Sequence, residues 1–504
     1  MMLKAGALSL ALLLASRLLG LGRESAQAAA FGTSGLADVA VLMLTLPDWL
    51  AGVAASGALA YVLVPAWAGQ DPAAVAGLQR RVARALMALG VATALGWALL
   101  AWQGGLARVL IAGLPKALGP VAAQALVWSA IAFPLALLAA LWGTRLQHER
   151  DFTGLYAANL AVNGALIAAI AVAGWGLAAG GAVTVLGVGL LAAMVLRLLW
   201  QAWRMPSGIP APDDALSTPV DVAEGRAGPP SIPLPRASLW TWAILSAGLP
   251  LALPFVARSL ASQAGEGGLA TFNYAWKLVE LPLVLAIQLV ATLAFPAVAR
   301  AVTQGLEDAA AREPVRIAFA LAFALACACA AGLLVGADAL AQLLFGWGRM
   351  REPALAQVAE WGRVAAMGLL PQAVAAVALT VLAAQGRMRP AAGLYALALL
   401  ALLGLAAAEP RSGAALMAVL NAVYMFVALG LLIALGAGAA RCLPVQAMLW
   451  PLGALLVVAA LLRATGGAGG LPMVSALALA VLAGLAVLGA AWHGAGSMRL
   501  ALRR

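Results

Sequence analysis

Long apolar segments separated by short polar ones run through the whole sequence, and this succession limits the fold more than any other feature. Hydrophobic residues make up 64% of the 504 residues and charged residues 10%, whereas a soluble domain carries about 25% charged residues. A bilayer core of about 30 Å needs about 20 apolar residues in one helix. The sequence therefore predicts an all-α polytopic membrane protein.

About fourteen segments are long and apolar enough to cross a membrane as helices. They lie near residues 3–22, 34–66, 82–104, 121–145, 153–175, 181–202, 238–262, 268–299, 315–343, 355–385, 390–408, 413–436, 444–463 and 471–492. The first of them resembles a signal peptide. However, Arg17, Arg23 and Glu24 precede the small residues at the cleavage position, so we expect a retained transmembrane helix.

The basic residues between these segments predict how the chain is oriented. With the N-terminus in the cytoplasm, about eighteen Lys and Arg residues fall on the cytoplasmic side and about eight outside, as the positive-inside rule requires. We therefore expect a multi-pass protein with both termini in the cytoplasm. The net charge of +11 is spread singly between apolar segments, without a basic stripe, so we expect no nucleic-acid partner.

One long polar connection divides the chain. Residues 204–236 are rich in Pro, Gly, Ser and Asp, which is typical of a disordered linker. The domains expected from this division are an N-terminal lobe at 1–203, a cytoplasmic linker at 204–236, a second lobe at 237–436 and a C-terminal part at 437–504.

A weak internal repeat crosses the linker. Leu46-Pro47 is followed by Pro65 in the first half, and Leu281-Pro282 is followed by Pro296 in the second. Proline-interrupted helices at corresponding places in two halves are typical of transporters with a binding site between the halves.

The sequence offers little for catalysis. No lysine follows the Gly-x-x-x-x-Gly pattern of an ATP-binding loop. The three cysteines and two histidines lack metal-ligand spacing. Asp38 and Asp48 are about 15 Å apart along one helix, too far for an acid–base pair. We therefore expect a transporter rather than an enzyme, with no cofactor and no metal.

Positive charges inside apolar segments are the most informative residues. Arg17, Arg23 and Lys277 stand in such segments, where an uncompensated charge costs at least about 2.5–3.5 kcal/mol. An anionic ligand such as a pyrophosphate would offset this cost, since arginine matches phosphate oxygens with a fork of donors. The alternatives are pairing with a nearby carboxylate and extension to the membrane surface. We favour the surface for Arg197, near a span end, and pairing for Arg363, near Glu360.

Several motifs resemble those of a known family. The first ~70 residues contain Ser16-Arg17 ahead of Leu-Gly, Arg23-Glu24, Phe31-Gly32, Asp38 before Leu-Pro, and a Val-Pro exit at Pro65. This order resembles the start of the MurJ/MviN lipid II flippases, part of the multidrug/oligosaccharidyl-lipid/polysaccharide exporter superfamily. Residues 274–282, Tyr-Ala-Trp-Lys-Leu-Val-Glu-Leu-Pro, are similar to that family's second-lobe motif, with Lys277 replacing the usual arginine. Residues 344–348 and 385–390 resemble two loop landmarks.

The resemblance implies an architecture and a site. The architecture is about fourteen helices in two pseudo-symmetric six-helix lobes, plus two C-terminal helices that form a groove for a polyprenyl tail. A cationic cavity between the lobes would receive the pyrophosphate of a lipid-linked sugar. The substrate-binding residues expected from the charges and motifs together are Arg17, Arg23, Glu24, Asp38, Asp48, Lys277 and Glu280.

The resemblance also implies a function. The hypothesis is a flippase of the bacterial inner membrane that moves lipid II, an undecaprenyl-pyrophosphate-linked glycan, from the cytoplasmic to the periplasmic leaflet by alternating access. Its expected partners are this lipid, the bilayer and cell-wall synthesis enzymes.

Two departures from the family pattern leave alternatives open. Ala51 stands where a cavity arginine is expected, and Ser56 where a glutamate is usual. The substrate could therefore be another undecaprenyl-linked oligosaccharide, of the exopolysaccharide or O-antigen type. An ion-coupled multidrug exporter and a non-transporting scaffold for envelope enzymes are weaker alternatives, since neither needs buried cations.

Overall fold

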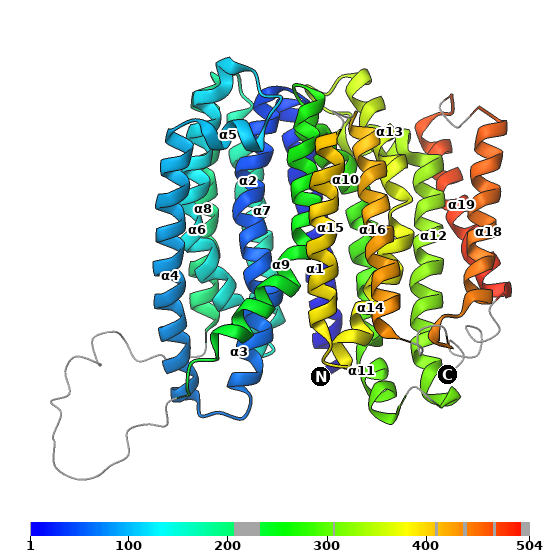
Figure 1. Ribbon diagram of the computed structural model, residues 1–504. Coiled ribbons are helices and arrows are strands. Elements are labelled where there is room, and N and C mark those ends of the chain that lie inside the picture. Colours follow the sequence, from blue (N-terminus) through cyan, green and yellow to red (C-terminus); the bar gives the residue numbers. More distant parts are fainter. Residues whose placement is uncertain are drawn as a thin grey trace, which may run out of the picture. The chain divides into compact units, whose positions relative to one another are not determined.

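A computed structural model describes residues 2–205, 232–305, 308–408, 412–436, 441–466 and 470–494. Within these residues the protein is built from helices, with no strand (Figure 1). Most of the predicted linker, residues 206–231, lies outside the described residues.

The helices follow the apolar segments closely. In the first half they are α1 (Met2–Phe31), α2 (Gly35–Val53), η1 (Ala54–Leu59), α3 (Ala60–Trp67), α4 (Pro72–Trp102), α5 (Gly105–Leu110), η2 (Lys116–Leu118), α6 (Gly119–His148), α7 (Phe152–Ala173) and α8 (Ala179–Arg204). In the second half they are α9 (Ala237–Ala261), η4 (Ser262–Ala264), α10 (Gly268–Pro282), η5 (Leu283–Gln288), α11 (Leu289–Gln304), α12 (Ala309–Phe345), α13 (Glu352–Ala366), α14 (Leu369–Ala384), α15 (Met388–Ala408), α16 (Gly413–Leu435), α18 (Val445–Ala464) and α19 (Met473–Gly494).

These helices confirm an all-α polytopic membrane fold. Among the described residues, eleven helices are long and apolar enough to cross a membrane alone, and the pair α13–α14, bent by 45°, makes a twelfth. The other two expected spans coincide with α1 and with the interrupted run from α10 to α11. Length and composition thus support eleven or twelve crossings in this part of the chain, and the count of about fourteen stays a prediction.

Contacts divide the chain into two compact units. Unit 1 comprises Met1–Ala26, Leu42–Val109 and Lys116–Leu251, and unit 2 comprises Gln27–Val41, Leu110–Pro115 and Ala252–Arg504. Helices α1, α2 and α9 therefore each begin in one unit and end in the other. The lobe boundaries expected from the sequence, 1–203 and 237–436, stay a prediction.

Unit 1 is organised around α6, which packs against α4, α7 and α8. Small residues let these helices approach closely, as in many membrane proteins. A Cβ atom added to Gly187 of α8 would lie 2.2 Å from the ring of Trp128 of α6, so only glycine fits there. At one end of the unit, Trp67 of α3 is buried with Leu63, Leu78 and Leu141 in an apolar cluster.

Unit 2 is organised around α12, which packs against α11, α13, α14, α18 and α19. Its contact with α19 also depends on small residues. A Cβ atom on Gly336 of α12 would lie 2.7 Å from Cβ of Ala480, and one on Gly484 of α19 would lie 3.2 Å from the carbonyl oxygen of Ala328. Ala480 and Gly484 are four residues apart on α19, which is the small-xxx-small pattern that brings membrane helices together.

Both halves of the weak sequence repeat contain a π-helical stretch. The six-residue stretch η1 lies between Pro47 and Pro65, and the six-residue stretch η5 lies between Pro282 and Pro296. A proline lacks the amide hydrogen that a regular helix needs and crowds the preceding turn. A wider helical turn relieves that conflict, and such turns occur often at functional sites.

Candidate functional site

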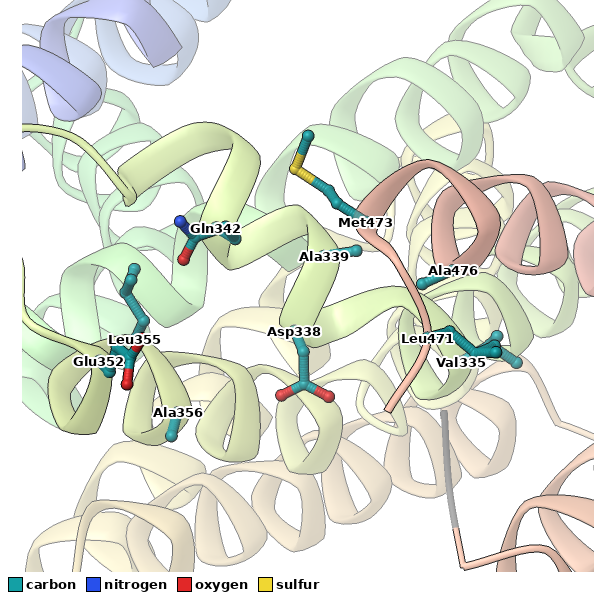
Figure 2. Close-up of a pocket in the computed structure, with 10 residues that line it drawn as sticks. All are labelled: Val335, Asp338, Ala339, Gln342, Glu352, Leu355, Ala356, Leu471, Met473 and Ala476. Atoms are coloured by element: carbon teal, nitrogen blue, oxygen red, sulfur yellow. The ribbon is translucent and has the colours of Figure 1, made fainter. Parts of the chain in front are cut away.

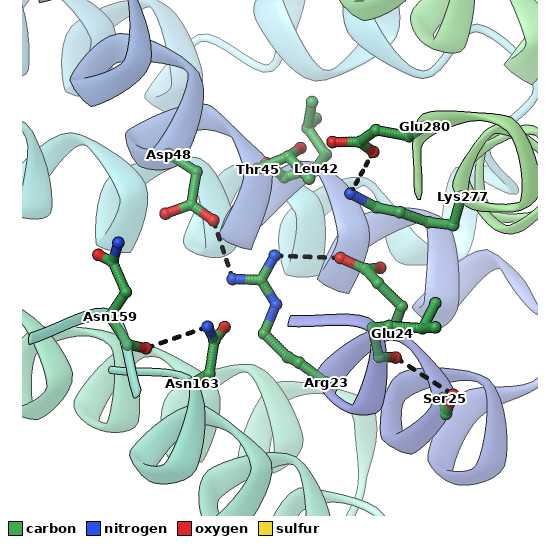
Figure 3. A network of polar contacts seen from close by, with 11 residues as sticks. Arg23, Glu24, Ser25, Leu42, Thr45, Asp48, Asn159, Asn163, Lys277 and Glu280 are labelled. Atoms are coloured by element: carbon green, nitrogen blue, oxygen red, sulfur yellow. Dashed lines mark hydrogen bonds and ion pairs between the residues drawn. The ribbon is translucent and has the colours of Figure 1, made fainter. Parts of the chain in front are cut away.

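In unit 1, Arg23 of α1 forms the centre of a buried ion-pair network (Figure 3). Its guanidinium donates from Nη1 to Oδ2 of Asp48 at 2.8 Å and from Nη2 to Oε1 of Glu24 at 3.0 Å. The Arg23 residue is 7% exposed and Glu24 is 0% exposed. A buried charge is stable only when it is paired and hydrogen-bonded. Arg23, Glu24 and Asp48, which are among the expected substrate-binding residues, therefore lie together in the structure.

The charge balance of this network differs from a simple cationic site. Arg23 carries one positive charge against the two negative charges of Glu24 and Asp48. Nε of Arg23 is buried without a hydrogen-bond partner among the described residues. The guanidinium therefore keeps one donor that its two carboxylates do not use.

Two further polar residues of unit 1 were not assigned to this network from the sequence. The amide nitrogen of Asn163 on α7 lies 3.8 Å from the Cβ position of Gly20, one turn before Arg23 (Figure 3). Arg197 of α8 is half-buried, and its Nε is buried without a hydrogen-bond partner among the described residues. The sequence signal that could have identified Asn163 is a pair of asparagines four residues apart in an apolar segment, Asn159 and Asn163.

In unit 2, Lys277 of α10 pairs with Glu280 one turn later. Nζ of Lys277 donates to Oε2 of Glu280 at 2.6 Å (Figure 3). Both side chains are partly exposed, at 21% and 31%. The neighbouring Trp276 is buried and stacks on Tyr424 of α16, with ring centroids 6.3 Å apart. Lys277 thus lies at the edge of a packed aromatic core and is paired with the carboxylate of Glu280.

Arg17 and Asp38 lie apart from these pairs. Arg17 is exposed, and because it precedes Arg23 by six residues, the two side chains point about 120° apart around α1. Asp38 of α2 belongs to unit 2 and is 0% exposed. Its carboxylate accepts hydrogen bonds from the amides of Gly267 and Ala270, each at 2.8 Å. Asp38 therefore caps the N-terminus of α10, a place where a negative charge is favoured, and its expected part in substrate binding stays a prediction.

The family landmarks around Asp38 form a tight joint within unit 2. The amide of Arg349 donates to the carbonyl of Ala29 at 2.9 Å, and the hydroxyl of Tyr274 donates to the carbonyl of Gly32 at 3.3 Å. Gly348 has a φ of +62°, and a Cβ there would lie 2.3 Å from the Ala29 oxygen. Only glycine tolerates that conformation and that approach. These hydrogen bonds hold backbone segments of unit 2 together.

Two positions depart from the family pattern, Ala51 and Ser56. Ala51 is buried on α2, one turn after Asp48. The side chain of Ser56 lies outside the described side chains.

A pocket of about 470 Å³ opens elsewhere in unit 2 (Figure 2). It is lined by α12, α13 and the start of α19, with Asp338, Gln342 and Glu352 among mostly apolar side chains. Asp338 accepts a hydrogen bond from Arg363 of α13. Arg363 thus pairs with Asp338, whereas the sequence suggested Glu360.

Metal chemistry finds no support in the described part of the chain, where no group of three or more His, Cys, Asp or Glu residues could hold a metal ion. Cys327 and Cys442 are buried and Cys329 is half-buried, all three as free thiols. The site contains two paired cations, Arg23 and Lys277.

Comparisons with known proteins agree on one family. A family model described as lipid II flippase MurJ matches residues 27–471. No curated protein sequence matches the chain. The solved structure of lipid II flippase MurJ in an inward closed conformation is similar over 96% of this chain and 98% of its own, with a TM-score of 0.77 and 14% identity.

Two further solved structures with similar folds are described as MOP superfamily transporters. An inward-facing multidrug resistance MATE family transporter of the MOP superfamily matches with a TM-score of 0.63 and 16% identity, over 85% of this chain and 94% of its own. A MOP superfamily transporter from Pyrococcus furiosus matches with a TM-score of 0.58 and 16% identity, over 87% and 95%. Together with the family match over most of its length, the chain belongs to the MurJ lipid II flippase family of membrane transporters.

Proposed function

We propose that this protein moves lipid II from the cytoplasmic to the periplasmic leaflet of the bacterial inner membrane by alternating access. The pyrophosphate is bound by Arg23 and Lys277, with Arg17 as a first contact. Glu24, Asp48 and Glu280 hold these cations between transport events. The observation that carries the proposal is the buried guanidinium of Arg23, which is held by two carboxylates inside an apolar helix and keeps one unused donor.

The proposed chemistry is an exchange of ion-pair partners. A buried arginine cannot lose its proton, so it must always have an anionic partner. Pyrophosphate oxygens have the geometry that a guanidinium fork recognises. When they approach Arg23, they replace Asp48, which is the more exposed of its two carboxylates. The carboxylate returns when the lipid leaves, so binding and release involve similar energies.

The membrane potential is a sufficient driving force. An inside-negative potential favours export of an anion by about 2.3 kcal/mol per charge for each 100 mV. A pyrophosphate carries more than one charge, and the sequence contains no ATP-binding loop. We propose this potential as the driving force for export of the headgroup.

The binding site is tested with purified protein in lipid nanodiscs. The probes are undecaprenyl pyrophosphate and undecaprenol, which differ only in the charged group. For Arg23→Gln and Lys277→Gln we expect affinity for the pyrophosphate lipid to fall about tenfold or more, since a hydrogen bond to a charged group contributes about 1.5–3 kcal/mol. Affinity for undecaprenol should not change.

Arg108→Gln is the matched control, because Arg108 is an exposed arginine of the short helix α5. It should bind both lipids as the wild type does. Wild-type affinity in both site variants would refute the proposed site. Failure of the wild-type protein to support growth of cells depleted of their own lipid II flippase would refute the substrate.

Another undecaprenyl-linked glycan is the second candidate substrate. It is favoured by Ala51, a buried alanine one turn from Asp48 at the position where the family resemblance predicts a cavity arginine. A headgroup other than that of lipid II would need different contacts near this position. Competition between lipid II and a lipid-linked exopolysaccharide unit for the nanodisc protein separates the two, and stronger competition by the latter would favour the second candidate.

A further inference from the structure

The pocket between α12, α13 and the start of α19 has no part in the site described so far (Figure 2). It lies where α12 ends at Phe345, where α13 begins at Glu352 and where α19 begins at Met473. Helices that cross a bilayer begin and end near its surface. Asp338 stands seven residues before the end of α12 at Phe345, which is about 10 Å along the helix axis. The pocket therefore lies at the depth of lipid headgroups.

The polar lining of this pocket is acidic. Asp338 and Gln342 are four residues apart on α12 and so share one face of the helix, and Glu352 lines the pocket from α13 (Figure 2). Asp338 accepts a hydrogen bond from Arg363, which compensates its charge. In the part of the chain that the structure describes, Glu352 forms no ion pair. Two carboxylates against one guanidinium leave a net negative charge here.

The rest of the lining is apolar and partly exposed. Leu471 and Met473 line the pocket and are 46% and 40% exposed, and the next residue of α19, Val474, is 73% exposed. Exposed apolar side chains of a membrane helix contact lipid chains. A pocket of about 470 Å³ has the size of a small-molecule site, in which a few polar groups select the ligand. The lining therefore suits a ligand with a cationic head and an apolar body.

We propose that this pocket binds the headgroup of a membrane phospholipid that carries a primary amine, as phosphatidylethanolamine does. A primary ammonium group has three N–H donors, and the side chains of Asp338, Gln342 and Glu352 offer acceptor oxygens from two helices. The ammonium group compensates the charge of Glu352 and shares Asp338 with Arg363. Arg351, which precedes Glu352 and is exposed, is a partner for the phosphate of the same lipid.

Other common headgroups satisfy these residues less well. A choline headgroup has the same charge, but its methyl groups replace the N–H donors that the carboxylates accept from. A glycerol headgroup has no cation, so the two carboxylates repel its phosphate. A soluble amine lacks the acyl chains that the exposed Leu471 and Met473 would contact. The proposal therefore predicts a preference for one headgroup among lipids with identical chains.

The experiment measures lipid binding to the purified full chain in detergent by native mass spectrometry. The probes are palmitoyl-oleoyl phosphatidylethanolamine, phosphatidylcholine and phosphatidylglycerol. We expect the first ethanolamine lipid to bind about tenfold or more tightly than the other two, because hydrogen bonds to charged groups are strong. In Asp338→Asn and Glu352→Gln, affinity for the ethanolamine lipid should fall to that of the choline lipid, whose own affinity should not change.

Three further variants separate this role from simpler ones. Glu360→Gln is the matched control, because Glu360 is an exposed carboxylate of α13 that does not line the pocket, and it should keep the preference. Asp338→Asn also breaks the ion pair with Arg363, whereas Glu352→Gln breaks none. Arg363→Gln removes the competitor for Asp338, so affinity for the ethanolamine lipid should rise, which a purely structural role of Asp338 does not predict.

Three outcomes would overturn the proposal. They are equal affinity of the wild type for the three lipids, a preference for ethanolamine that persists in both Asp338→Asn and Glu352→Gln, and equally tight binding of glycerophosphoethanolamine, the soluble headgroup without chains. The proposal is independent of the transported lipid. Glu352→Gln should bind undecaprenyl pyrophosphate as the wild type does, and Arg23→Gln should keep the headgroup preference, so either account can fail alone.

Discussion

At the scale of single residues, two cations that the sequence marked as functional each have a carboxylate partner within 3.0 Å. Arg23 is held by Glu24 and Asp48, and Lys277 by Glu280. The partners determine what each charge can do. The Asp48 side chain that holds Arg23 is 36% exposed, whereas Asp38 is held by backbone amides and cannot leave without breaking a helix cap.

Replacing Asp38 tests its role as a cap. Asp38→Ala leaves two amides at the N-terminus of α10 without an acceptor, and a buried unpaired donor costs about 1–3 kcal/mol. We expect a lower thermal unfolding midpoint in detergent and unchanged affinity of the folded protein for undecaprenyl pyrophosphate. An unchanged midpoint with weakened binding would show that Asp38 acts on the substrate instead.

The sequence could locate the charged residues but not all of their partners. The pair of Lys277 and Glu280 could be predicted from the sequence because residues three apart on a helix are neighbours. The partner of Asp38 could not be predicted, because Gly267 is 229 positions away. The group that Gly267 contributes is a backbone amide, which no motif marks. For Arg197, near a span end, extension to the membrane surface stays a prediction.

At the scale of helices, polar bonds fix the ends and small residues fix the contacts between them. Asp151 accepts hydrogen bonds from the amide of Gly154, at the start of α7, and from Arg204, at the end of α8. In unit 2, α12 and α19 meet through glycine and alanine alone at Gly336 and Ala480. The stability of the polar contacts of Asp151 should depend on pH, whereas the stability of the contact between Gly336 and Ala480 should depend on side-chain volume.

The pairing of α7 with α8 should weaken in acid. The hydrogen bond from Arg204 holds the pKa of Asp151 below its ordinary value. A lowered pKa in the folded state adds stability above the unfolded value of about 3.9, and this stability is lost as the pH falls through the folded value. The thermal midpoint of the wild type should therefore exceed that of Arg204→Gln at pH 7, and the gap should close as the pH falls below about 4. A gap independent of pH would contradict this account.

The contact of α12 with α19 should not tolerate a larger side chain. In Gly336→Val the new Cβ would lie 2.7 Å from that of Ala480, and overpacking of this kind costs about 1–3 kcal/mol. We expect a lower thermal midpoint in detergent. Gly453→Val is the matched control, because a Cβ at Gly453 of α18 meets nothing within 4 Å. Equal losses in both variants would assign the effect to helix propensity alone.

Hydropathy predicted where helices run but not how they are interrupted. The ends of α6, α7 and α8 lie within a few residues of the expected spans, because a run of apolar residues that fills the bilayer leaves the backbone no alternative to a helix. The π-helical stretches η1 and η5 were not predicted. They depend on the register of backbone hydrogen bonds, and prolines several residues away mark them only loosely.

At the scale of the whole molecule, the compact units do not follow the order of the chain. Gln27–Val41 belongs to unit 2 although unit 1 continues from Leu42. The sequence suggested a division at the linker because composition changes there, but contacts between distant residues decide which segments form a unit. The family and the all-α membrane fold were accessible from the sequence, since motif order and hydropathy are local properties.

The orientation of the chain in the membrane is open to a direct test. Lys116 lies in η2, just before the start of α6, and Gln147 lies near the end of α6; Gln147 is exposed and Lys116 is partly exposed. With Cys327, Cys329 and Cys442 replaced by alanine, Lys116→Cys should react with a membrane-impermeant maleimide in intact spheroplasts. Gln147→Cys should react only after permeabilisation. The reverse pattern would place the N-terminus outside and contradict the positive-inside assignment.

The bonds from Asp38 to Gly267 and Ala270 limit how such proteins can be recombined. A chimera joined at the polar connection would take the start of α2 from one parent and α10 from the other. The cap, and the joint of Ala29 with Arg349, would then have to form between sequences that did not diverge together. Exchanges that carry residues 27–41 along with everything after residue 251 keep these bonds within one parental sequence, and natural shuffling among relatives should respect the same seam.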